Sequence, residues 1–154
     1  MADLKETIAK DLAARYTKLA GVVRDLAAPL REEQFWGKPF AFGNSFGHLV
    51  LHLTGNLNYY IGAQIAATGY VRDRPREFSE ASRPAKNEVL NKFDEAIDMV
   101  VRTIRAQSAE DWSKEYSAKG AEAKDRFEML LQCATHLHHH IGQMMYISFE
   151  LKRD

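Results

Sequence analysis

The chain has 154 residues, with 21 basic and 21 acidic side chains and therefore no formal net charge at neutral pH. This length fits one domain with a substantial core, so we expect a single domain over residues 1–154. Balanced charge gives no long-range attraction for nucleic acid or an anionic membrane, and we expect neither as a partner. The single Cys133 cannot form an intramolecular disulfide, and the N-terminal segment lacks the apolar run of a signal peptide, which predicts a cytoplasmic protein.

Four segments show the three- and four-residue apolar spacing of amphipathic helices, and none of useful length alternates as a strand does. The first predicted helix covers residues 3–26 and ends before Pro29, because proline disfavours the helical conformation in the residue that precedes it. The second begins at Asn44 or Ser45, either of which can cap it, and continues to Gly69. Neither helix holds an apolar run as long as the roughly 18 residues of a membrane span.

The third predicted helix begins near Pro84 and carries apolar residues to Ile104, and the fourth runs from near Asp125 to Leu151. The connection over residues 69–83 is long for a simple bundle. At about 3.3 Å per residue it could run the length of the bundle, which would make the second and third helices parallel. We therefore predict an all-α four-helix bundle with a long crossover between helices two and three.

Four of the six histidines lie in HLHHHIGQ, residues 136–143, on the fourth predicted helix. Residues four apart project from one helix face, so His136 and His140 point together and can share one metal ion. At about 100° per residue, His138 lies nearly opposite this direction and His139 lies at its edge. The spacing therefore predicts a metal site that uses two of these four side chains.

A third ligand has to come from another helix. His52 is a better candidate than His48, because His52 lies deep within the apolar run LVLHLTGNL. Three neutral imidazoles would leave one position open for water or substrate, as in catalytic zinc sites. Zinc and nickel both accept imidazole, so the spacing does not choose between them. Histidines that simply pack in the core or lie on the surface are the alternative interpretation, and we expect Cys133 to be a small buried residue rather than a thiolate ligand.

Several polar residues lie near these candidate ligands on the same helices. Gln143 follows His140 by one turn, whereas Asn56 and Tyr59 follow His52 by one and two turns. Such side chains can orient ligands or a metal-bound water, although ordinary packing is an alternative. No Asp or Glu stands at helical spacing from the ligands, so Gln143, Tyr59 or His139 would have to assist catalysis.

The segments SFGHLVLHLTG and HLHHHIGQ together resemble the DinB-like (DinB/YfiT-like) metal-binding four-helix bundles, and the resemblance covers essentially the whole chain. In that family a Ser/Thr-x-Gly segment leads into His-Leu on the second helix, and His-x-x-His-His-x-Gly-Gln lies on the last. The matching residues are Ser45, Gly47, His52 and Leu53, then His136, His139, His140, Gly142 and Gln143. The chain departs from the pattern at Ile141, where many members carry Arg.

The resemblance implies an up-down-down-up bundle, frequent homodimers, and His52, His136 and His140 as ligands of a divalent metal ion. It also implies activities that include transferases and isomerases dependent on low-molecular-weight thiols. We therefore expect a metal-dependent thiol S-transferase or isomerase that acts on a small electrophile. The alternatives are a metal-dependent hydrolase and a non-enzymatic module, either a metal-stabilised dimer or a small-ligand sensor. A fourth protein ligand, such as His48, His139 or Cys133, would favour the non-enzymatic module.

Overall fold

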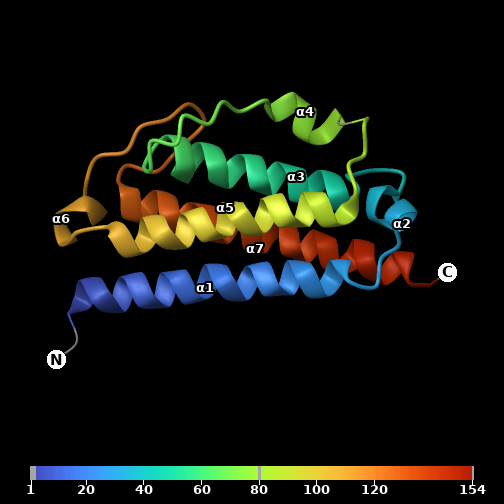
Figure 1. Ribbon diagram of the computed structural model, residues 1–154, viewed down its shortest axis with the longest axis horizontal. Helices are drawn as coiled ribbons and strands as arrows, with labels where there is room; N and C mark the ends of the chain where they lie inside the picture. The colour runs from blue at the N-terminus through green and yellow to red at the C-terminus, as the bar shows by residue number, and fades with distance from the viewer. Residues whose placement is uncertain (1–2, 80, 154) are drawn as a thin grey trace.

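The structure, a computed structural model, describes residues 3–79 and 81–153. Its long helices lie side by side (Figure 1) and are α1 (Leu4–Ala27), α3 (Phe46–Leu57), α5 (Lys86–Ala106) and α7 (Arg126–Leu151). Helices α1 and α3 each pack against both α5 and α7. In Figure 1, α1 and α7 run in one direction and α3 and α5 in the other. The described residues contain no strand, so the predicted all-α class is confirmed.

Side-chain caps explain where three of the long helices begin. Asp3 accepts a hydrogen bond from a backbone N–H in the first turn of α1, and Asp125 does the same for α7. Of the two predicted caps of α3, Ser45 is the one used, since its hydroxyl oxygen accepts the backbone N–H of His48 at 3.1 Å. The prediction that this helix continues to Gly69 is wrong, because α3 ends at Leu57 and a π-helical segment, η1 (Asn58–Ala63), follows it.

Short helices occupy the three long connections, and the sequence did not predict them. They are α2 (Glu32–Trp36), α4 (Arg74–Ser79) and α6 (Ala109–Trp112). Each is too short for an apolar periodicity to be recognised. The connection between α3 and α5 returns along the outside of the bundle and carries α4 against α3 (Figure 1). This long crossover, which the sequence allowed, places side chains of α4 beside the second predicted helix.

Aromatic side chains pack α2 against the start of α3. A Cβ atom on Gly47 would lie 2.7 Å from the ring of Trp36, so only glycine allows this close approach. The ring of His48 packs against Trp36 with centroids 5.2 Å apart, and its Nδ1 lies 2.7 Å from the hydroxyl of Ser45. The Ser-x-Gly part of the motif therefore has a structural role at this end of the bundle.

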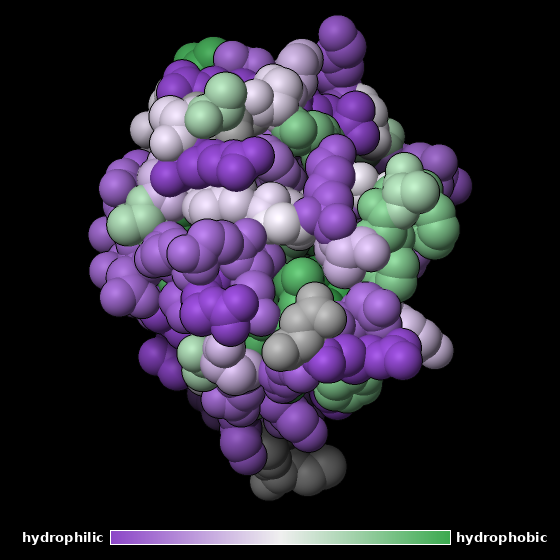
Figure 2. Space-filling model, turned by 90° about the vertical axis from the view of Figure 1, so that its right-hand side faces the viewer, coloured by the Kyte–Doolittle hydropathy of each residue, from purple (hydrophilic) through white to green (hydrophobic). Residues whose placement is uncertain are grey.

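Figure 2 shows the end of the bundle at which α2 lies, where hydrophilic residues cover most of the surface. Within residues 3–79 and 81–153, no helix is both long and apolar enough to cross a membrane.

Candidate metal centre

Three histidine side chains from two helices converge on one point. His52 projects from α3, and His136 and His140 project from adjacent turns of α7. The Nε2 atom of His136 lies 3.2 Å from Nε2 of His52 and 3.1 Å from Nε2 of His140. A tetrahedral zinc ion with bonds of about 2.05 Å holds neighbouring ligand nitrogens about 3.3 Å apart. Both distances from His136 thus match the spacing of metal ligands. The ligand atoms of the three histidines all lie within 4.8 Å of one another and could hold one metal ion.

A buried carboxylate fixes the orientation of His52. Oε2 of Glu77, from α4, lies 2.8 Å from Nδ1 of His52. Both side chains are buried, with 6% of Glu77 and 5% of His52 exposed. A carboxylate accepts the proton on Nδ1, which leaves the lone pair of His52 on Nε2, the atom that faces the other histidines. Arg72 donates two hydrogen bonds to the same carboxylate, at 2.6 and 2.9 Å.

His140, a candidate ligand on α7, is oriented in a similar way. Nδ1 of His140 lies 2.7 Å from the side-chain oxygen of Gln143, one turn further along α7. The amide oxygen accepts the Nδ1 proton, so the lone pair of His140 also lies on Nε2. Nδ1 of His136 is buried and makes no hydrogen bond within the described part of the chain. Two of the three imidazoles are therefore held in the tautomer that metal binding at Nε2 requires.

Burial favours the neutral form of His136 and His140. Desolvation, together with the nearby His140 and His52, lowers the pKa of His136 to about 3. Desolvation also lowers the pKa of His140, partly offset by the hydrogen bond to Gln143. Burial raises the pKa of Glu77, but the hydrogen bonds from His52 and Arg72 outweigh this effect and leave it below its ordinary value. Both histidines of α7 are thus neutral nitrogen donors, and the carboxylate beside His52 is ionised.

The three histidines line a cavity of about 360 Å³. Its other polar lining residues are Asn44, Asn56, Tyr60, Arg72, Arg74, Gln132 and Gln143. The side-chain oxygen of Asn56 is buried there and has no hydrogen-bond partner within the described residues. None of the described lining residues is Asp or Glu. The site therefore combines a potential metal centre with space for a small molecule and an unused hydrogen-bond acceptor.

The sequence model of the DinB superfamily matches residues 15–144, which is more than half of the chain. The chain belongs to the DinB superfamily. This confirms the resemblance that the two histidine motifs indicated. No curated protein and no solved structure gives a significant match to the chain.

The remaining candidate ligands of this DinB-superfamily chain lie outside the cluster. His48 contacts Ser45 and Trp36 at the start of α3 and does not belong to the group of three. His138 is exposed on α7. Cys133 is buried and lines the cavity, but it is not part of the histidine group, and burial raises the pKa of its thiol to about 12. The buried, neutral thiol agrees with the sequence interpretation of Cys133.

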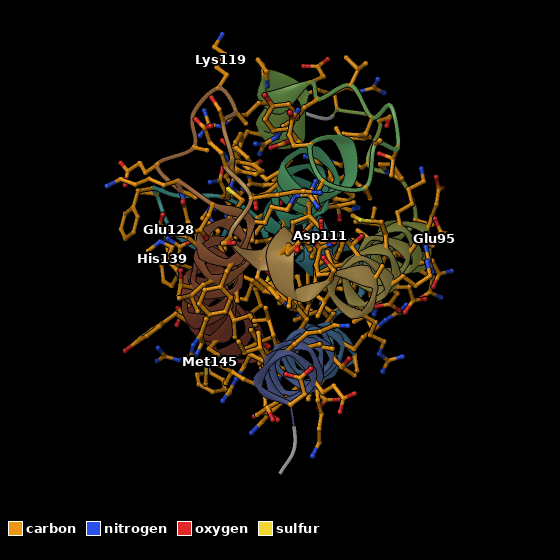
Figure 3. All side chains as sticks on the ribbon, turned by 90° about the vertical axis from the view of Figure 1, so that its left-hand side faces the viewer. Glu95, Asp111, Lys119, Glu128, His139 and Met145 are labelled. Atoms are coloured by element: carbon orange, nitrogen blue, oxygen red, sulfur yellow. The ribbon has the colours of Figure 1, made fainter. Side chains whose placement is uncertain are left out.

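The three predicted assistants occupy different positions. Gln143 lines the cavity and contacts His140, whereas Tyr59 does not line it and Tyr60 does. The sequence prediction assumed α-helical spacing after His52, but the wider turn of η1 changes which tyrosine reaches the cavity. His139 is exposed, lies on the outer side of α7 (Figure 3), and contacts the site only through its ring, 5.1 Å from that of His140.

Sequence reasoning missed Glu77 and Arg72 because both lie in the crossover, outside the helices that carry the ligands. On α3 and α7 themselves, no acidic residue lies within one turn of a candidate ligand. An acidic residue nevertheless reaches His52 through tertiary structure. One signal was present in the motif: the glycine three residues after His52. A Cβ atom on Gly55 would overlap Oε1 of Glu77 and lie 2.8 Å from its Cδ.

Proposed function

We propose that this DinB-superfamily protein is a metal-dependent enzyme in which His52, His136 and His140 hold one divalent ion, zinc or nickel. The observation that carries the proposal is the convergence of three histidine side chains that line one cavity. The group of potential ligands among the described residues has three members, and a structural tetrahedral zinc site usually has four. This supports an open coordination position and an enzyme over a purely structural metal site.

For the reaction, we infer S-transfer or isomerisation of a small electrophile with a low-molecular-weight thiol. A divalent ion in this site would lower the pKa of a bound thiol or water. The described cavity lining offers no carboxylate that could act as a general base toward water. This favours a thiolate as the nucleophile over the hydrolase alternative. In S-transfer, the sulfur bonds to the electrophilic carbon, the leaving group departs with its bonding electrons, and the thiol proton passes to solvent.

The protein side chains have separate roles in this proposal. Glu77 is a positioning residue, because it holds the proton on Nδ1 of His52 and faces away from the shared Nε2 atoms. Gln143 does the same for His140. Asn56 lines the cavity, and its buried side-chain oxygen has no hydrogen-bond partner among the described residues. The cytoplasmic location and the absence of nucleic-acid and membrane partners remain predictions from the sequence.

The first test is metal content per chain, measured by elemental analysis on untagged protein. We expect close to one equivalent in the wild type, loss in His140→Ala, and retention in His138→Ala, which is the matched control on the same helix. Negligible metal in the wild type after incubation with zinc, nickel and manganese would refute the metal site. Equal losses in both variants would refute the assignment of ligands to one face.

The second test is turnover of a chromogenic aryl halide with a panel of small thiols. Metal-loaded protein should accelerate the reaction in a thiol-dependent way, and chelated protein and His140→Ala should not. A metal-loaded protein that hydrolyses esters without any thiol would favour the hydrolase. Metal binding that stabilises the fold without activity in either assay would favour the non-enzymatic module.

A further inference from the structure

We infer that the outer face of α7 is a self-association surface on which a second copy of the chain packs its own α7 in the antiparallel direction. This inference does not rest on the metal centre. A homodimer was expected from the resemblance alone, which identified neither the surface nor the register. Five of the nine large hydrophobic side chains exposed among the described residues belong to α7: Phe127, Leu131, Met145, Tyr146 and Phe149.

Three of these five residues lie on one continuous stripe along α7, together with three exposed residues that are smaller or polar. Leu131, Thr135, His138, Gly142, Met145 and Phe149 are all exposed, and successive members are four, three, four, three and four positions apart. This is the spacing of a coiled-coil seam. From residue 131 to residue 149 the seam is about 27 Å long at 1.5 Å per residue. Figure 3 shows Met145 pointing outward from α7, away from the bundle.

The seam faces away from the site. At about 100° per residue, His136 and His140 project roughly 140° to 180° from the direction of Leu131, whereas all six seam residues fall within about 40° of it. A partner on the seam would therefore leave the cavity open. The same helix would bind metal on one face and the second copy on another.

Side-chain size selects the antiparallel direction. If residue i of one protomer meets residue 280 − i of its partner, Leu131 faces Phe149, Thr135 faces Met145, and His138 faces Gly142. Each smaller side chain then meets a larger one, as in the knobs-into-holes packing of coiled coils. A Cβ atom on Gly142 would meet nothing within 4 Å, so the imidazole of His138 from the other copy has room there. Parallel packing would instead bring Gly142 against Gly142 and leave a gap.

Charge at the two ends of the seam selects the same register. Glu128 and Lys152 are both exposed, and they occupy positions that sum to 280. Antiparallel packing therefore places a carboxylate beside an ammonium group at each end of the interface. A parallel pair would place Glu128 beside Glu128 and Lys152 beside Lys152, and like charges across an interface oppose association.

Sedimentation velocity over a range of protein concentrations tests the surface. We expect a dimer whose dissociation constant rises at least about tenfold in Phe149→Glu. Phe42→Glu is the matched control, because Phe42 is 79% exposed but lies in the loop before α3. A wild-type monomer at every concentration would overturn the inference. The inference would also be overturned if Phe42→Glu dissociated the dimer and Phe149→Glu left it intact. Circular dichroism checks that both variants remain helical.

Disulfide trapping tests the register. In the double variant Thr135→Cys/Met145→Cys, oxidation should yield a covalent dimer, because these positions sum to 280. The two positions lie about 15 Å apart on one helix and cannot bond within a chain. Thr135→Cys/Phe149→Cys, whose positions sum to 284, is the control and should crosslink at least about tenfold more slowly. Equal rates would overturn the register, and the metal content of the wild type would be unaffected by either result.

Discussion

Gly55 of α3 leaves the space that the carboxylate of Glu77 occupies. A Cβ atom at position 55 would overlap Oε1 of Glu77, which also accepts a hydrogen bond from Arg72 at 2.6 Å. The other carboxylate oxygen contacts Nδ1 of His52 at 2.8 Å. A glycine without any metal-binding capacity thus determines how a candidate ligand is oriented. This contact links the sequence motif around His52 to the crossover that carries Glu77.

Gly55→Ala should therefore weaken metal binding. The added methyl group displaces Glu77 from His52, and loss of such a carboxylate partner commonly lowers metal affinity about 10- to 100-fold. Isothermal titration with zinc measures the effect. Gly21→Ala is the matched control, since Gly21 lies in α1 and a Cβ atom there meets nothing within 4 Å. Unchanged affinity in Gly55→Ala would contradict a role for Glu77 in orienting His52.

Glu77→Ala should destabilise the fold by about 3 kcal/mol, because it leaves the guanidinium of Arg72 buried without its carboxylate partner. Arg72 is only 9% exposed in its side chain, so water cannot readily replace the ion pair. The double variant Glu77→Ala/Arg72→Met removes both charges and should recover part of this loss. Urea unfolding of metal-free protein separates the effect from metal binding. Equal stabilities of the single and double variants would show that the ion pair does not determine the cost.

Removal of the metal should lower the melting temperature. A ligand at 100 times its dissociation constant stabilises the native state by about 2.7 kcal/mol, provided that it does not bind the unfolded chain. For a domain of this size, that corresponds to a decrease of about 5 to 10 °C on chelation. Calorimetry with and without chelator measures the change, and His140→Ala should show none. A wild-type melting temperature that is independent of chelator would argue against a site coupled to folding.

Cys133 should resist alkylation in the native protein. Burial raises the pKa of its thiol to about 12, so the reactive thiolate is scarce at pH 8, and the side chain is 1% exposed. Iodoacetamide should label Cys133 only in denaturant, as mass spectrometry of the intact protein can show. Rapid labelling of folded protein at pH 8 would contradict the buried environment. Labelling that zinc prevents would indicate that Cys133 contributes to the metal site.

The local parts of the site were predictable because helical spacing is a short-range property. Once α7 is a helix, His136 and His140 share a face whatever surrounds them. The burial of His52 followed from the apolar run around it. Tyr59 shows where this reasoning fails: a single π-helical segment after Leu57 is enough to bring Tyr60 to the cavity instead. The sequence around these tyrosines carries no clear signal for that wider turn.

By itself, the sequence determined the four long helices, the superfamily and the histidines that could act together, since apolar periodicity and i, i+4 spacing are set by the chain's local geometry. The sequence predicted that His52 joins His136 and His140, and the fold brings the three together. Only the tertiary structure decided that a carboxylate from α4 fixes His52 and that Gly55 makes room for it. These relationships join segments distant in the chain. They depend on how the crossover packs against α3, which no local pattern specifies.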